Sequence, residues 1–160
     1  MAVKKSRTNL VSTAPSDLAV HSWLAVVRAY NLCVGLLSQR LADLDLHVGE
    51  HEVLVNLLRA PGITQQELAQ RCFVAKSGVS MLLSRMERAK LVKRQADATD
   101  ARAKRLSLTA KGERLAIAAQ KIQTEIVLAM ASQSSDHDLT IIADAMQRTS
   151  AVLETLRKSG

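Results

Sequence analysis

The chain has 160 residues, of which 48% are apolar but only 2% aromatic, and it carries a formal net charge of +7. A chain of this length and apolar content forms one domain with a real core, which excludes a disordered protein. No apolar run approaches the roughly 18 residues that cross a membrane, and two cysteines are too few for a disulfide framework. We therefore expect a cytoplasmic protein, away from membranes, made of helices packed through aliphatic side chains.

The positive charge is concentrated in two segments. Residues 61–115 carry twelve cations and five acids, and residues 1–16 carry three cations and no acid. The segments 17–60 and 116–160 are slightly acidic. We expect residues 1–16 to form a flexible basic tail without a secretory signal. The central segment should attract a phosphate backbone, with an anionic membrane surface as the weaker alternative.

The N-terminal part predicts two helices. Apolar residues recur at helical spacing over 17–46, which indicates a long amphipathic helix with an N-cap at Ser16 or Asp17. A second helix follows over about 49–60 and stops at Pro61, because proline does not continue a helix.

A helix-turn-helix pattern comes next. Thr64 and Glu67 form a capping box that opens a short helix, and a longer helix follows over about 75–89. The inner face of this longer helix is apolar, at Val79, Leu82, Leu83 and Met86. Its outer side carries Lys76, Ser77, Ser80, Ser84 and Arg88, with Met81 and Arg85 flanking. Serines and cations suit base edges and phosphates, although a solvated helix face has the same composition.

The C-terminal half predicts a hairpin and two long helices. Short strands at 91–95 and 104–108 frame a polar tip, and helices follow over about 109–131 and 138–158. Two short helices, a basic helix and a hairpin make a mainly α winged helix-turn-helix with a two-stranded β wing. The long terminal helices are too apolar to serve this small module alone, which indicates dimerisation. The apolar positions that we assign to the dimer surface are Ile126, Ile142, Met146 and Val152.

Three pieces of the sequence carry a family resemblance. Residues 74–94 read VAKSGVSMLLSRMERAKLVKR, and Asp100-x-Arg102 and Leu108-Thr109-x-x-Gly112 follow. Together they resemble the multiple antibiotic resistance regulator (MarR) family of bacterial transcription factors. The resemblance implies a homodimer with interlocked terminal helices and two DNA-binding lobes. Family members usually repress neighbouring genes and release DNA when a small phenolic or anionic ligand binds, or when a cysteine is oxidised.

The resemblance also assigns DNA contacts. Arg102 matches the wing arginine that enters the minor groove, and Asp100 matches the carboxylate that orients it. We expect Asp97 to make a local turn bond at the entry of the hairpin. The reading-helix contacts implied are Lys76, Ser77, Ser80, Ser84 and Arg85. Lys93, Lys104 and Arg105 are predicted to contact the DNA backbone or to flank the wing.

One position departs from the family pattern. The family commonly has glycine where this chain has Lys90, at the end of the reading helix. A left-handed residue often ends a helix at this position. Lysine there implies either a modest strain or a different helix ending.

Candidate effector contacts lie on the first helix. Trp23 and Tyr30 are seven residues apart on one face, with Arg28 nearby, and they could hold a phenolic ring with His51 in the same pocket. In the family, the ligand pocket lies between this helix and the DNA-binding lobe. Core packing explains the two aromatic side chains equally well.

Metal and redox chemistry are weakly supported. His47 and His51 have helical i, i+4 spacing, but Gly49 separates them, so we expect surface or capping histidines rather than a metal site. Cys33 and Cys72 are expected to pack in the core. We find no phosphate loop or nucleophile elbow, and therefore predict no enzyme, no cofactor and no metal.

The sequence thus predicts a dimeric DNA-binding regulator, which we expect to be a repressor. Its expected parts are the tail at 1–16, the dimerisation helices at 17–46 and 115–158, and the DNA-binding lobe at 47–114. Its partners would be a pseudo-palindromic duplex operator, a second copy of the chain and a small aromatic or anionic effector. The alternatives are an architectural DNA-binding protein without an effector, and a redox- or metal-responsive regulator.

Overall fold

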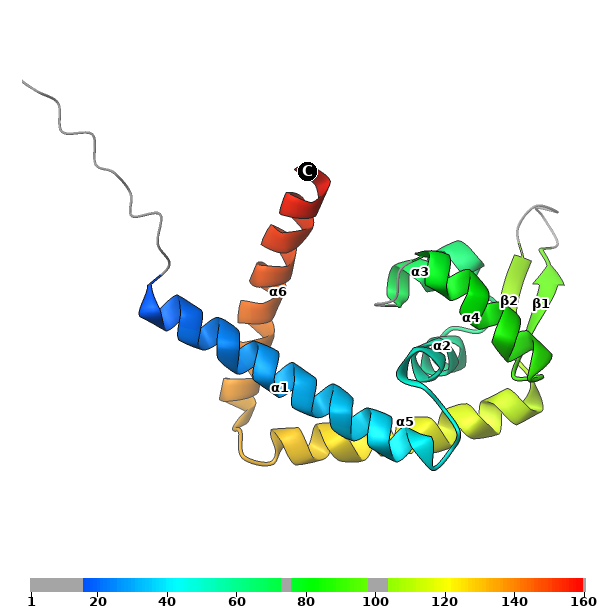
Figure 1. Ribbon diagram of the computed structural model, residues 1–160, viewed down its shortest axis with the longest axis horizontal. Coiled ribbons are helices and arrows are strands. Elements are labelled where there is room, and N and C mark those ends of the chain that lie inside the picture. Colours follow the sequence, from blue (N-terminus) through cyan, green and yellow to red (C-terminus); the bar gives the residue numbers. More distant parts are fainter. Residues whose placement is uncertain (1–15, 73–75, 98–103, 160) are drawn as a thin grey trace, which may run out of the picture. The chain divides into compact units, whose positions relative to one another are not determined.

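The computed structural model describes residues 16–72, 76–97 and 104–159 (Figure 1). Its elements are α1 (Asp17–Ala42), α2 (Val48–Arg59), α3 (Gln65–Arg71), α4 (Lys76–Arg88), β1 (Val92–Ala96), β2 (Lys104–Leu108), α5 (Ala110–Ala131) and α6 (Asp136–Ser159). The predicted mainly α fold and the order of its elements are confirmed, with small shifts at the element ends. The chain divides after Leu36 into two compact units.

The first helix ends earlier than the sequence predicted. The Leu46 amide donates to the Leu41 carbonyl (3.1 Å) and the Asp45 amide donates to the Ala42 carbonyl (3.0 Å). Asp45 has a φ of 53°, so the chain leaves the helix through a left-handed residue. Aspartate tolerates this backbone conformation better than most residues, and therefore no glycine marks the end of the helix in the sequence.

α1 is apolar over most of its surface. Leu37 and Leu41 are its buried residues, whereas Trp23, Leu32 and other large apolar side chains are exposed. By length and composition alone, with a mean hydropathy of 1.3 over 18 residues, α1 could cross a membrane. Arg28, Asn31 and other polar residues interrupt this stretch, so it contains no continuous apolar run of about 18 residues, as expected.

The second unit has one hydrophobic core around α2. This helix packs against α5 and also contacts α3, α4 and β2 (Figure 1). The fully buried large side chains of this unit are Leu41, Val53, Leu54, Leu57, Leu68, Val79, Leu83, Met86 and Leu106. The apolar stripes of the helix-turn-helix and of the hairpin therefore meet on one central helix.

The hairpin is joined to the helix-turn-helix by backbone hydrogen bonds. β1 and β2 pair antiparallel, with Val92 opposite Leu108. The Gly62 amide donates to the Leu106 carbonyl (2.8 Å), and the Leu106 amide donates to the Ile63 carbonyl (2.9 Å). Gly62 has a φ of 82°, which a glycine adopts without strain. The turn before α3 thus lies along β2 and fixes the base of the wing.

Candidate nucleic-acid interface

The predicted capping box forms at the start of α3. The Glu67 amide donates to Thr64 Oγ1 (3.2 Å), and the Thr64 amide donates to Glu67 Oε2 (2.6 Å). Hydrogen bonds from the Thr64 amide and hydroxyl hold the pKa of the Glu67 carboxyl below its ordinary value. This box sets the start of the first helix of the helix-turn-helix.

α4 has a buried inner face and an exposed outer face, as predicted for a reading helix. Val79, Leu83 and Met86 are fully buried, whereas Leu82 is only half-buried. Ser80, Met81, Arg85 and Arg88 are exposed, and Ser84 is half-buried. The Ser84 hydroxyl donates to the Ser80 carbonyl (3.0 Å). The side chains of Lys76 and Ser77 lie outside the described residues.

Arg85 is held by an acid of α2. Its Nε lies 3.1 Å from Glu50 Oε1, and Glu50 Oε2 accepts a hydrogen bond from the His47 amide (3.0 Å). Glu50 is buried while Arg85 is exposed, so one fixed carboxylate orients a guanidinium that remains accessible. The contact of Glu50 with Arg85 has no signal in the sequence, because an acid at the third position of a helix is explained by capping alone.

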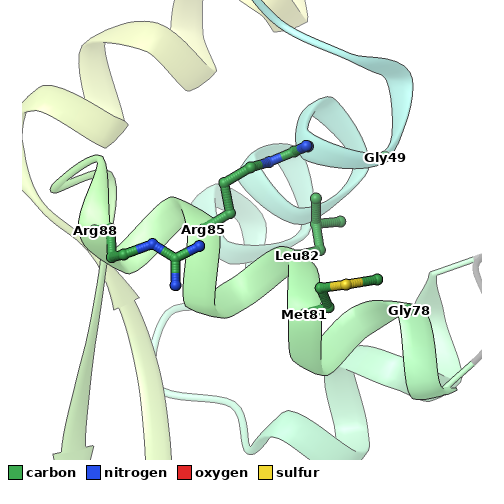
Figure 2. Close-up of a pocket in the computed structure, with 6 residues that line it drawn as sticks. All are labelled: Gly49, Gly78, Met81, Leu82, Arg85 and Arg88. Carbon is green, nitrogen blue, oxygen red and sulfur yellow. The ribbon is translucent and has the colours of Figure 1, made fainter.

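A cavity of about 460 Å³ lies beside α4. It is lined by Gly49, Gly78, Met81, Leu82, Arg85 and Arg88. Figure 2 shows Arg85 extending from α4 towards the turn of α2 that carries Gly49. Apolar walls with two guanidinium groups suit a small molecule that has an apolar body and an anionic group.

The end of α4 confirms the unusual position of Lys90. This residue has a φ of 57°. The Lys90 amide donates to the Glu87 carbonyl (3.0 Å), and the Leu91 amide donates to the Met86 carbonyl (2.9 Å). These two bonds are those of a Schellman motif with lysine at its left-handed position.

The Leu-Thr-x-x-Gly segment clamps α5 to this helix end. Thr109 Oγ1 accepts a hydrogen bond from the Gly112 amide (3.1 Å) and donates to the Lys90 carbonyl (2.6 Å). A Cβ at position 112 would lie 2.0 Å from the Leu91 carbonyl oxygen, so only glycine fits there. The motif therefore fixes the angle between α4, the wing and α5.

The wing contains an ion pair that the sequence did not predict. Arg105 Nε donates to a carboxylate oxygen of the buried Asp97, and Arg105 Nη1 donates to the Gly62 carbonyl (2.9 Å). Arg105 thus ties the hairpin to the turn before α3, in addition to any contact with DNA. Lys93 and Lys104 are exposed. Asp100 and Arg102 lie outside the described residues.

The four predicted effector contacts differ in burial. Trp23, Arg28 and Tyr30 are exposed on α1. His51 is only 3% exposed, which corrects our expectation of a surface or capping histidine. Neither of its ring nitrogens has a hydrogen-bond partner among the described residues. Burial, and then the charge of Arg59, lowers the pKa of the His51 imidazole.

The cysteines and histidines form no evident redox or metal centre. Cys72 is buried, as predicted, and burial raises the pKa of its thiol to about 11, so it stays protonated at neutral pH. Cys33 is half-buried in α1. Within residues 16–72, 76–97 and 104–159, no group of three or more His, Cys, Asp or Glu side chains could hold a metal ion.

The predicted dimer residues divide into two groups. Ile126 is only 4% exposed, so it belongs to the core of the chain itself, which corrects our expectation that it forms an uncovered surface. Ile142, Met146 and Val152 of α6 are exposed, as are Val127 and several other apolar side chains of α5 and α6. A periodic apolar pattern on α5 could not tell these two environments apart.

Two consecutive helices, a basic outward face on the second and an antiparallel strand pair bonded to the segment before the first define a winged helix-turn-helix protein. The sequence profile of the MarR family matches residues 43–103. This segment of the chain therefore matches the MarR family of transcriptional regulators, and its fold is that of solved regulators of this family. Neither the family nor the matched relatives are enzymes, as predicted.

Sequence relatives match about half of the chain. An uncharacterised HTH-type transcriptional regulator of Bacillus cereus is 32% identical over 91 residues, which are 57% of this chain and 60% of that protein. The transcriptional regulator HosA of Escherichia coli O157:H7 is 36% identical over 75 residues, which are 47% of this chain and 56% of HosA. The chain thus spans less than two thirds of the length of these relatives.

Solved structures match over most of the chain. MepR of S. aureus, in complex with DNA, is 27% identical with a TM-score of 0.74, and the match covers 83% of this chain and 97% of MepR. AbsC of Streptomyces coelicolor, a MarR family transcriptional regulator, is 24% identical with a TM-score of 0.81, covering 89% of this chain and 98% of AbsC. The match to AbsC covers 89% of this chain, and the residues outside the 26-residue α1 make up less than that share. The shared fold therefore includes part of α1.

Proposed function

We propose that the chain is a cytoplasmic, homodimeric regulator, acting as a repressor, that binds a pseudo-palindromic operator with α4 of each subunit in the major groove. The observation that carries this proposal is the outward face of α4. It presents Ser80, Arg85 and Arg88 on a helix whose opposite side is fully buried. The neighbouring wing adds the exposed cations Lys93 and Lys104. Serines and arginines read base edges, and the wing lysines contact phosphates.

The first experiment is footprinting with the full-length protein on duplexes selected from a random library. A regulator protects one short pseudo-palindrome, whereas an architectural protein coats DNA without a preferred site. Lys93→Ala, present in both subunits, should reduce the slope of log affinity against log salt by roughly 2. Ser80→Ala should instead relax the sequence preference at symmetric positions. Equal weakening of every sequence by both variants would overturn the assignment of the reading helix.

For the wing tip we keep the proposal that Asp100 orients Arg102 for the minor groove. Asp97 and Arg105 support it by analogy, because this second aspartate in the same hairpin also holds an arginine. If Asp100 orients Arg102, Asp100→Asn should weaken binding, with no further effect once Arg102→Ala is present. If Asp100 were only a surface charge, its removal would tighten binding at low salt.

Dimerisation through α1, α5 and α6 is supported by the apolar side chains that these helices leave exposed. Ile142, Val152 and Leu156 of α6 are more than half exposed. A two-fold dimer would cover such surfaces and place two reading helices on half-sites one DNA turn apart. Deletion of residues 139–160 should therefore yield monomers or aggregates without specific DNA binding. A soluble, operator-binding dimer from this deletion would contradict the proposal.

We also propose that a small aromatic or anionic effector binds in the cavity beside α4 and that its binding makes the protein release the DNA. This cavity includes Arg85, so an anion bound there competes with both Glu50 and DNA for one guanidinium. Aromatic acids that raise the melting temperature should release the selected operator. Leu82→Phe, which fills the cavity, should abolish release, whereas Trp23→Ala should leave it intact. The opposite pattern would place the effector at Trp23, Arg28, Tyr30 and His51.

A further inference from the structure

Met81 lies at the centre of the outward face of α4. At 3.6 residues per turn, its side chain leaves the helix nearly opposite the buried Val79 and Leu83. Arg88 lies two helical turns further along the same outward line, and Arg85 flanks Met81 (Figure 2). A helix that enters a major groove with this face would place Met81 against the bases.

The exposure of Met81 is unusual within its own lobe. Its side chain is 74% exposed, whereas Met86, on the opposite face of the same helix, is fully buried. Among the described residues between α1 and α5, Met81 is the only large apolar side chain that is exposed. The other exposed large apolar residues lie on α1, α5 and α6, where a second subunit would cover them. Met81 is therefore separate from the surface that suits a protein partner.

The chemistry of the groove offers one matching group. The C5-methyl group of thymine is the apolar group that a base pair presents in the major groove. Methionine is long, unbranched and polarisable, so its thioether adapts to the position of a methyl group. Arg85 and Arg88 beside it bring opposite charge to the phosphates and acceptor edges around that methyl group.

We propose that Met81 reads a thymine by its methyl group in each half-site of the operator. This inference rests on the proposed function, because it requires α4 to enter the major groove. Met81 also lines the cavity beside α4, so the competing role is contact with an effector alone. An effector contact would not depend on the methyl groups of the DNA.

The test uses the selected operator with single thymines replaced by deoxyuridine, which removes only the methyl group. Affinities are measured for the full-length wild-type protein, for Met81→Ala and for Ser80→Ala. At one symmetric pair of positions, the wild type should lose about fourfold in affinity per methyl group, or about fifteenfold for both half-sites. These factors correspond to about 0.8 kcal/mol per buried methyl group at 1.4 kcal/mol per tenfold change.

The two variants separate methyl reading from a general loss of affinity. Met81→Ala should bind the thymine and deoxyuridine operators equally, whereas Ser80→Ala should keep the wild-type ratio between them. The inference is overturned if Met81→Ala keeps the wild-type ratio at every position, or if the operator has no symmetric thymine. Failure of the wild type to select any DNA would instead overturn the proposed function itself. An unchanged denaturation midpoint in Met81→Ala shows that the lobe remains folded.

Discussion

Replacing Lys90 by glycine should stabilise the protein. The lysine has a φ of 57°, and a Cβ atom in the left-handed region costs about 1 kcal/mol. The hydrogen bonds to Glu87 and Thr109 involve only backbone atoms of Lys90, so glycine keeps them. The free energy of unfolding should therefore rise by about 1 kcal/mol. At an m-value of about 2 kcal/mol/M, the urea midpoint rises by about 0.5 M.

The measurement is urea unfolding of DNA-free protein at a fixed protomer concentration, because subunit association also contributes to stability. Ala89→Gly is the matched control, since Ala89 is not among the residues with a positive φ. Glycine there adds freedom to the unfolded chain and should lower the midpoint. A Lys90→Gly midpoint equal to or below that of the wild type, with an unchanged m-value, would refute the strain at this helix end.

Three further predictions concern the packing of the lobe. Gly112→Ala places a Cβ against a carbonyl oxygen and should lower the free energy of unfolding by more than about 3 kcal/mol, measured by urea denaturation. Gly35→Ala is the control, because its Cβ meets open space and the substitution should be neutral or stabilising. The pKa of His51 is lowered in the folded protein, so as the pH falls the imidazole is protonated in the unfolded chain before it is protonated in the folded one. The free energy of unfolding should therefore fall as the pH drops below about 6.5. Urea midpoints at pH 7.5 and 5.5 should differ less in His51→Leu than in the wild type. Asp97→Ala removes the carboxylate that pairs with Arg105, and it should lower both the urea midpoint and the affinity for the operator. If it changes neither quantity, the ion pair contributes to neither stability nor DNA binding.

Local sequence signals predicted most of the elements. The capping box at Thr64, the N-cap at Thr109 and the apolar stripe of α4 each depend on residues within one or two helical turns. Such signals act through the backbone nearby, so one sequence is enough to detect them. The end of α1 was misplaced because Asp45 takes the left-handed position without a glycine to mark it.

Contacts between distant elements could not be predicted in the same way. Glu50 meets Arg85 only because α2 and α4 pack side by side, and Arg105 meets the carbonyl of Gly62 across 43 residues of sequence. A periodic pattern likewise cannot tell Ile126, which is buried within the chain, from Ile142, which is exposed. The pattern defines an apolar face, whereas the tertiary arrangement decides what covers it.

The acids around the basic segment shape the proposed DNA-binding surface more than they reduce its charge. Three arginines of the reading helix and wing are each paired with a carboxylate: Arg85 with Glu50, Arg94 with Glu87, and Arg105 with Asp97. A free arginine loses up to about 2 kcal/mol of rotamer entropy when it is fixed in one geometry. If a carboxylate already restricts the arginine side chain, part of this rotamer entropy is lost when the protein folds and is not lost again when the protein binds DNA. The same carboxylate weakens long-range attraction, which salt screens within about 10 Å. For the proposed selection of one operator among many duplexes, a defined direction of each guanidinium contributes more to selectivity than one additional unit of net charge.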